Sequence, residues 1–176
     1  MDDTGTQRSV ELYVRSLAPH AAVQSQLGRS ERFESLVDSG AFESCTMHVV
    51  GRGIVHEGPY ELASTAQLLR RRIGQMRAWA ADHDATVPGL ETTTVTESCL
   101  HETGYTVTRV PQNFLLEFEG DSLRRCSPAV YDGERFSVDD HLDALRASAR
   151  ASDAETVESD SDEARLRSAT AAESNP

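Results

Sequence analysis

The chain has 176 residues and a formal net charge of -12, with 29 Asp and Glu against 17 cations, every one of which is arginine. Lysine is absent, and isoleucine occurs only at Ile54 and Ile73. A surface of well-hydrated carboxylates without lysine stems is typical of proteins that stay soluble in molar salt, so the composition favours salt adaptation over ordinary acidity.

Three features of the sequence bear on its compartment. The first residues, with two aspartates in the first four, have neither the basic nor the apolar region of a secretion signal, and no stretch approaches the length of a membrane span. The cysteines Cys45, Cys99 and Cys126 are odd in number and widely spaced, which gives no disulfide framework. We therefore expect a cytoplasmic protein with reduced thiols and no membrane partner.

Composition also divides the chain. From residue 147 onward Ser, Ala, Asp and Glu predominate, with almost no large apolar side chain to offset the entropy of ordering. The sequence thus predicts a loose start over residues 1–7, a single domain over 8–146 and a disordered acidic tail over 147–176.

The first half of the domain predicts two strands around a helix. Apolar and polar residues alternate over 10–15 and again over 45–50, which is typical of half-buried strands. Between them, apolar residues of 23–37 recur at helical spacing, and Gly40 is placed to stop that helix. Gly51, Arg52 and Gly53 then predict a loop or bulge.

The clearest pattern in the chain is an apolar stripe at steps of four and three, which predicts a helix of about 20 residues. The stripe consists of Leu62, Ala66, Leu69, Ile73, Met76 and Ala80. Strands are predicted over 91–96, 105–110 and 114–118. Ser137 with Asp140 forms a capping-box variant that opens a last short helix.

The order β-α-β-α-β-β-β-α predicts an α+β fold, a mostly antiparallel sheet with the helices on one face. On this arrangement the other face is open to solvent. It would carry Tyr13, Arg15, Thr46 and His48, which are candidates for contact with a ligand or a protein partner.

Several segments resemble a family of small acidic haloarchaeal proteins labelled as helix-turn-helix domain proteins. They are residues 10–19, Gly51-Arg52, residues 77–80, Cys126-Ser127 and Asp132-Gly133. The resemblance covers about residues 8–146 and implies a DNA-binding regulator. It implies no particular site residues.

A helix-turn-helix could be accommodated only around Gly28, with residues 20–27 as the first helix and 31–37 as the second. The alternative is one amphipathic helix that tolerates Gly28 in its interior. Arg29 stands where the turn would usually bury an apolar side chain, which favours the single helix.

Arg70, Arg71, Arg72 and Arg77 form the one basic cluster, on the long predicted helix. Arg71 lies opposite the apolar stripe and is predicted to face solvent. Guanidinium groups suit phosphate and carboxylate equally well. In an acidic chain we expect salt bridges to local Asp and Glu, with nucleic-acid contact as the alternative.

Metal and catalytic motifs are lacking. Cys45 and His48 would face opposite sides of a strand, and Gly51-Arg52-Gly53 lacks the third glycine of a dinucleotide fingerprint. We expect no metal, no cofactor and no enzymatic activity. Two functional hypotheses remain: a DNA-binding regulatory module that could form a homodimer, and a small-ligand-binding or protein-interaction domain.

Overall fold

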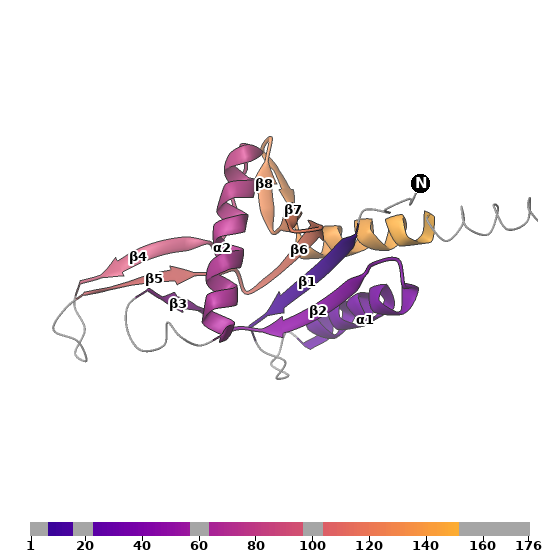
Figure 1. The fold of residues 1–176 in the computed structure, drawn as a ribbon, viewed down its shortest axis with the longest axis horizontal. Helices are drawn as coiled ribbons and strands as arrows, with labels where there is room; N and C mark the ends of the chain where they lie inside the picture. The colour runs from indigo at the N-terminus through magenta and orange to yellow at the C-terminus, as the bar shows by residue number, and fades with distance from the viewer. Residues whose placement is uncertain (1–6, 16–22, 57–63, 97–103, 152–176) are drawn as a thin grey trace, which may run out of the picture.

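The computed structural model describes residues 7–15, 23–56, 64–96 and 104–151 (Figure 1). The strands are β1 (Arg8–Val14), β2 (Ser44–Val49), β3 (Gly53–Val55), β4 (Glu91–Val95), β5 (Tyr105–Arg109), β6 (Asn113–Glu119), β7 (Ser122–Ser127), β8 (Ala129–Tyr131) and β9 (Glu134–Phe136). The helices are α1 (Val23–Ser39), α2 (Ser64–Asp82) and a C-terminal helix over 138–151. The predicted α+β class is confirmed.

A four-stranded sheet forms the centre of the molecule, with the order β2-β1-β6-β7. Its β1–β6 and β6–β7 pairs are antiparallel, as the sequence predicted for most of the sheet, whereas β1 and β2 are parallel. Helix α1 carries the chain from the end of β1 back to the start of β2, and a parallel neighbour requires such a crossover.

Helices cover both faces of this sheet, so the expectation that they share one face is wrong. Val10, Leu12 and Leu115 pack with residues of α1 and the C-terminal helix, whereas Tyr13 and Phe114 pack with residues of α2. Strand β6 is buried at five consecutive positions, residues 114–118. A strand with apolar residues at consecutive positions presents apolar groups to both faces, and each face then needs a cover.

A second sheet, with the order β3-β5-β4, carries β4 and β5 away from the body as a long two-stranded ribbon (Figure 1). Helix α2 lies between this ribbon and the central sheet. Gly53 allows β3 to approach β5 closely, because a Cβ atom there would stand 2.2 Å from the carbonyl oxygen of Thr108. A β8–β9 hairpin forms the third, two-stranded sheet.

The two predicted signals for helix ends are confirmed: Gly40 stops α1, and Ser137 with Asp140 caps the start of the C-terminal helix. Helix α1 ends at Ser39, followed by Gly40 with a positive φ of 65°. At the C-terminal helix, the amide of Asp140 donates to Ser137 Oγ at 3.2 Å, and the amide of Ser137 donates to Asp140 Oδ2 at 2.9 Å. None of the described helices is long and apolar enough to cross a membrane.

The C-terminal helix continues past residue 146, the predicted end of the domain. Leu142, Leu145 and Ala149 are buried against the central sheet and α1. Ala149 keeps the helical spacing of the two leucines, but its small side chain made the segment resemble the tail in composition. Residues 152–176 lie outside the described part of the chain.

Candidate nucleic-acid interface

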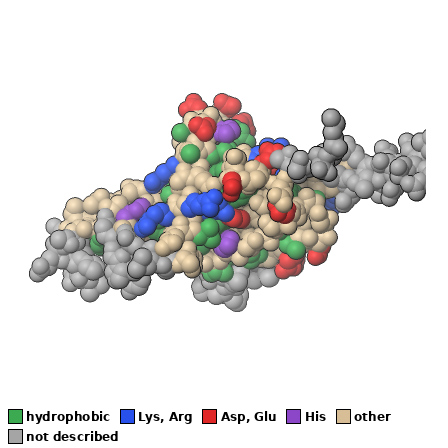
Figure 2. Space-filling model, in the orientation of Figure 1, with side chains coloured by type: hydrophobic (Ala, Val, Ile, Leu, Met, Phe, Trp, Pro, Cys, Tyr) green, Lys and Arg blue, Asp and Glu red, His purple; other side chains and the backbone are tan. Residues whose placement is uncertain are grey.

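Helix α2 is a cationic element in an acidic chain. It carries four arginines and one acidic residue, Asp82 at its last position, which gives a formal charge of +3. Leu69, Ile73, Met76 and Trp79 form its buried side. Figure 2 shows cationic side chains gathered over α2 and toward the base of the ribbon.

The side of α2 opposite Leu69 faces solvent and holds no carboxylate before Asp82, the last residue of the helix. Its exposed residues, at helical spacing, are Ser64, Gln67, Arg71, Gly74 and Ala78. Small side chains at three of these positions leave the helix backbone accessible around two long polar groups. Arg71 and Gln67, four residues apart, therefore project from one face.

The four arginines of the predicted cluster have different surroundings. Arg72 is built into the body: its Nε donates to Glu11 Oε2 at 2.7 Å, its Nη2 donates to Glu11 Oε1, and its guanidinium lies 4.4 Å from the centre of the Phe118 ring. Only 13% of its side chain is exposed. Arg72 therefore holds α2 on the sheet and is not available to a partner.

Arg71 has the opposite character, because its side chain is 61% exposed and its one ion pair within the described residues is with the fully exposed Asp121, at 3.4 Å. A pair so exposed is weak and easily exchanged for another anion. Arg70 is half-buried, and Arg77 is exposed. Seven residues apart, these two share the side of α2 that lies about 100° from the buried stripe.

Arg77 connects α2 to the ribbon through a line of hydrogen bonds. Its Nη2 donates to Thr92 Oγ1 on β4. Thr92 Oγ1 lies 2.7 Å from Thr108 Oγ1 on β5, which in turn lies 2.7 Å from His56 Nε2 just beyond β3. The sequence did not single out the threonines or His56, because only strand pairing brings them together: the register of β4 on β5 places Thr92 opposite Thr108, and the pairing of β3 with β5 brings His56 to the same strand.

The open sheet face predicted to carry Tyr13, Arg15 and His48 does not exist as such. Tyr13 is fully buried and stacks between His48, at 4.7 Å, and Phe114, at 4.4 Å. Burial and a hydrogen bond to Glu11 raise the pKa of its phenol. Arg15 is half-buried and donates to the Val110 carbonyl at 3.4 Å. Alternation placed Tyr13 on a solvent face, but α2 covers that face.

A polar cluster between β6, β7 and the C-terminal helix has the residue types of a catalytic triad. Ser127 Oγ lies 3.0 Å from His141 Nδ1, and His141 Nε2 lies 3.4 Å from Glu117 Oε2. Ser127 and His141 are 0% exposed and Glu117 is 2% exposed. No substrate reaches a serine so deeply buried, so the cluster joins the helix to the sheet.

Comparison with known families gives one match. A family model described as a helix-turn-helix domain matches residues 2–150. The chain belongs to this helix-turn-helix domain family. No curated protein and no solved structure matches the chain significantly. The match spans both large sheets and the three described helices, so membership applies to the whole fold and does not locate a motif.

The helix-turn-helix that the family's description names is not found around Gly28. Helix α1 runs without interruption from Val23 to Ser39, so the single-helix interpretation holds and the two-helix one is wrong. Elsewhere in the described residues, β2 and β3 separate α1 from α2, and the six strands β4 to β9 separate α2 from the C-terminal helix. No two described helices follow each other through a short turn.

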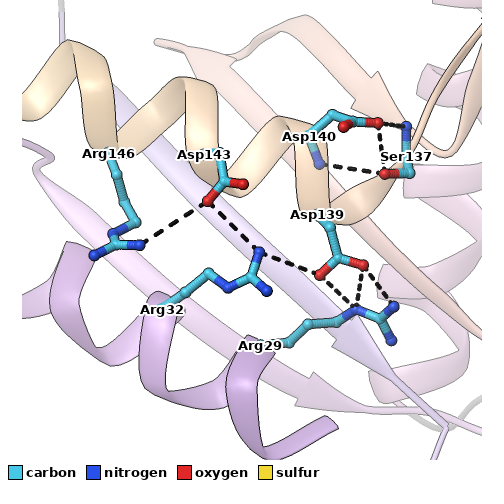
Figure 3. Close-up of polar contacts among 7 residues, drawn as sticks. All are labelled: Arg29, Arg32, Ser137, Asp139, Asp140, Asp143 and Arg146. Atoms are coloured by element: carbon cyan, nitrogen blue, oxygen red, sulfur yellow. Dashed lines mark hydrogen bonds and ion pairs between the residues drawn. The ribbon is translucent and has the colours of Figure 1, made fainter. Parts of the chain in front are cut away.

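The arginines of α1 are occupied by the C-terminal helix (Figure 3). Arg29 Nη2 lies 2.7 Å from Asp139 Oδ2, and Arg32 Nη1 lies 3.4 Å from Asp139 Oδ1 and 3.5 Å from Asp143 Oδ1. The exposed residues of α1 include Glu31, Glu34 and Asp38. An acidic outer face repels phosphate, which argues against nucleic-acid contact through α1.

A groove of about 450 Å³ lies beside the start of the C-terminal helix. Its lining includes Pro88, Pro111 and Pro128, with Arg29 and Asn113 among the polar residues. The Asn113 Oδ1 atom is buried and has no hydrogen-bond partner among the described residues. Arg29 is already paired with Asp139, whereas Arg135, which also lines the groove, is exposed.

Proposed function

We propose that this helix-turn-helix family member is a non-enzymatic regulatory module that binds duplex DNA, with α2 as the helix that enters the major groove. The observation that carries the proposal is the outer side of α2, which is the one described helix face with exposed arginine and no carboxylate before Asp82. Family membership supports the same function. We further propose that it acts in the cytoplasm of a halophilic host.

High salt decides how such a helix must recognise DNA. Affinity from phosphate neutralisation falls steeply with salt concentration, so in molar salt the binding free energy must come from base edges and from DNA shape. Arginine pairs with guanine and glutamine with adenine in the major groove, and each good pair is worth about 1–3 kcal/mol of discrimination. Arg71 and Gln67 are the residues of α2 placed for this role.

Selection from a pool of random duplexes in molar potassium chloride tests the proposal. The parent should enrich a definite sequence, and Arg71→Gln should lower affinity for the selected site by about 10-fold while relaxing preference at one position. Arg150→Gln is the matched control, because Arg150 is an exposed arginine on the C-terminal helix. A parent that enriches no sequence would remove the DNA-binding function.

Ligand binding is the weaker of the two functions. Its original basis, an open sheet face with Tyr13 and His48, is gone because α2 covers Tyr13. The groove beside Asn113 is one described place that could take a small molecule. DNA binding takes precedence because the helix-turn-helix family match supports it and α2 offers exposed charge, whereas the groove has one paired arginine, Arg29, beside one exposed arginine, Arg135.

A further inference from the structure

We propose that Arg77 is an anchor for a DNA backbone phosphate and that Thr92, Thr108 and His56 position it. The inference rests on the proposed DNA-binding function and assigns the ribbon a part in it. Arg71 and Gln67 would contact base edges, whereas Arg77, on the side of α2 that faces the ribbon, would contact the sugar-phosphate backbone beside the groove.

The position of Arg77 on α2 favours phosphate over bases. Arg77 is six residues beyond Arg71, which places the two side chains about 120° apart around the helix axis. A helix that lies in the major groove directs its outermost residues to the base edges and its flanking residues to the backbone. Arg77 is the flanking residue on the side of β4, as its hydrogen bond to Thr92 shows.

The hydrogen-bond line has a defined direction at the Arg77 end. A guanidinium only donates, so Thr92 Oγ1 accepts from Arg77. The Thr92 hydroxyl can then donate to Thr108 Oγ1, and the hydroxyl of Thr108 to His56 Nε2, at 2.7 Å each. Thr108 is fully buried, so this line fixes Thr92 from inside the sheet.

The hydrogen bond from Arg77 to Thr92 restricts a long, flexible side chain before it binds a partner. A free arginine loses rotamer freedom when it is immobilised, and a guanidinium already held in place loses less on binding. Within the described residues Arg77 makes this one hydrogen bond, and arginine has five donors, so four remain for phosphate oxygens. Thr92 therefore acts on phosphate through Arg77.

Salt titrations of binding to a selected duplex and to a random one test this division of roles. Arg77→Gln should weaken both complexes by the same factor, about 3-fold to 10-fold, and reduce the salt slope by about 1. Thr92→Val, which removes only the hydroxyl, should weaken both by about 3-fold, and Thr92→Ser should restore binding. Thr93→Val is the matched control, because Thr93 is exposed on the other face of the same strand.

The double variant Arg77→Gln with Thr92→Val distinguishes positioning from independent contact. If Thr92 acts through Arg77, the double variant should bind as Arg77→Gln alone does. Additive losses, or a changed sequence preference in either single variant, would overturn the proposal. A melting temperature for each variant identifies losses that come from unfolding, and a loss of binding that follows the melting temperature would also overturn it.

An NMR titration with a dinucleotide can test the phosphate anchor independently of the proposed DNA-binding function. Thymidylyl-thymidine has one phosphodiester and no groove, and its titration into the parent should move the NMR signals of Arg77 Nε and the Thr92 methyl group. If these signals move while no duplex sequence is selected, Arg77 binds phosphate but the proposed DNA-binding function is wrong. If duplexes bind and the dinucleotide leaves Arg77 unmoved, the anchor is wrong.

Discussion

Arg72 and Glu11 form a two-pronged ion pair that ties α2 to β1 across the central sheet. The two side chains are 13% and 15% exposed, and the carboxylate of Glu11 also accepts a hydrogen bond from Tyr13 at 2.7 Å. The pair therefore lies at the place where α2 meets the body. One arginine of the cluster maintains the fold, so a functional test must treat it apart from its neighbours.

Arg72→Gln should destabilise the protein, and Arg71→Gln should not. The first change leaves the largely buried Glu11 and the buried Tyr13 without their cation, which costs about 3 kcal/mol and lowers the melting temperature by roughly 10 °C. Arg71 loses only an exposed contact. Thermal melts of the two variants check the contrast, and equal melting temperatures would contradict the structural role of Arg72.

Gly28→Ala should stabilise the protein. Gly28 lies inside continuous helix α1, and a Cβ atom there meets nothing within 4 Å. Alanine in a helix interior is favoured over glycine by about 0.5–1 kcal/mol. Gly40→Ala is the matched contrast and should destabilise by about 1 kcal/mol, because Gly40 has a φ of 65°.

Urea or thermal unfolding measures both glycine variants. A helix-turn-helix with Gly28 in its turn would reverse the first result, since a turn glycine resists replacement by alanine. Destabilisation by Gly28→Ala would therefore argue against the uninterrupted helix.

The uninterrupted α1 illustrates what the sequence could and could not predict. Local signals sufficed for Gly40 as a helix stop, for the Ser137–Asp140 cap and for the apolar stripe of α2, because each depends on neighbours within one or two turns. They also sufficed for the α+β class. These local signals did not predict that helices cover both faces of the central sheet. Alternation at Val10 and Leu12 indicates which residues share a face, but not which element packs on the opposite face.

Pairing between distant segments explains the remaining differences. Thr92 and Thr108 resemble ordinary strand residues until the register of β4 on β5 places them opposite each other. Arg72 was indistinguishable from Arg71 by residue type, and its role depends on Glu11, which lies 61 positions away in the chain. Composition likewise suggested the tail for Ala149, whose burial depends on contacts with the central sheet and α1.

Acid should weaken the junction of β6 with the C-terminal helix. Burial alone would raise the pKa of Glu117, but hydrogen bonds from His141 and Arg8 outweigh it and lower this pKa to about 2. Burial lowers the pKa of His141. Both groups bind protons more weakly when folded, so they stabilise the fold above their unfolded pKa values and cease to do so as pH falls.

The resulting loss of folding stability occurs over two pH ranges. His141 should begin to reduce stability as pH falls below about 6.5, and Glu117 should add a loss on the order of 3 kcal/mol between about pH 4.5 and pH 2. Urea unfolding from pH 7 to pH 2.5 measures both. Glu117→Gln should be less stable at pH 7 and should flatten the lower range. An unchanged slope there would show that Glu117 does not carry the acid sensitivity.

Salt should determine whether the domain folds. Over the whole chain the acidic residues outnumber the arginines by 12, and within residues 8–146 the 20 acidic residues outnumber the 14 arginines by 6. Pairs such as Arg29 with Asp139 already occupy several of these arginines. Repulsion among the remaining carboxylates therefore outweighs the attraction that salt would also screen. The Debye length shrinks from about 10 Å at 0.1 M to about 3 Å at 1 M, so molar salt removes most of this repulsion. Circular-dichroism melts should show cooperative unfolding in molar potassium chloride and a large loss of structure in dilute buffer.

Glu31→Gln with Glu34→Gln, on the exposed face of α1, should raise the melting temperature in dilute buffer more than in molar salt. Melts that are identical at the two salt concentrations would contradict salt adaptation and leave the acidity of the chain as a matter of solubility alone.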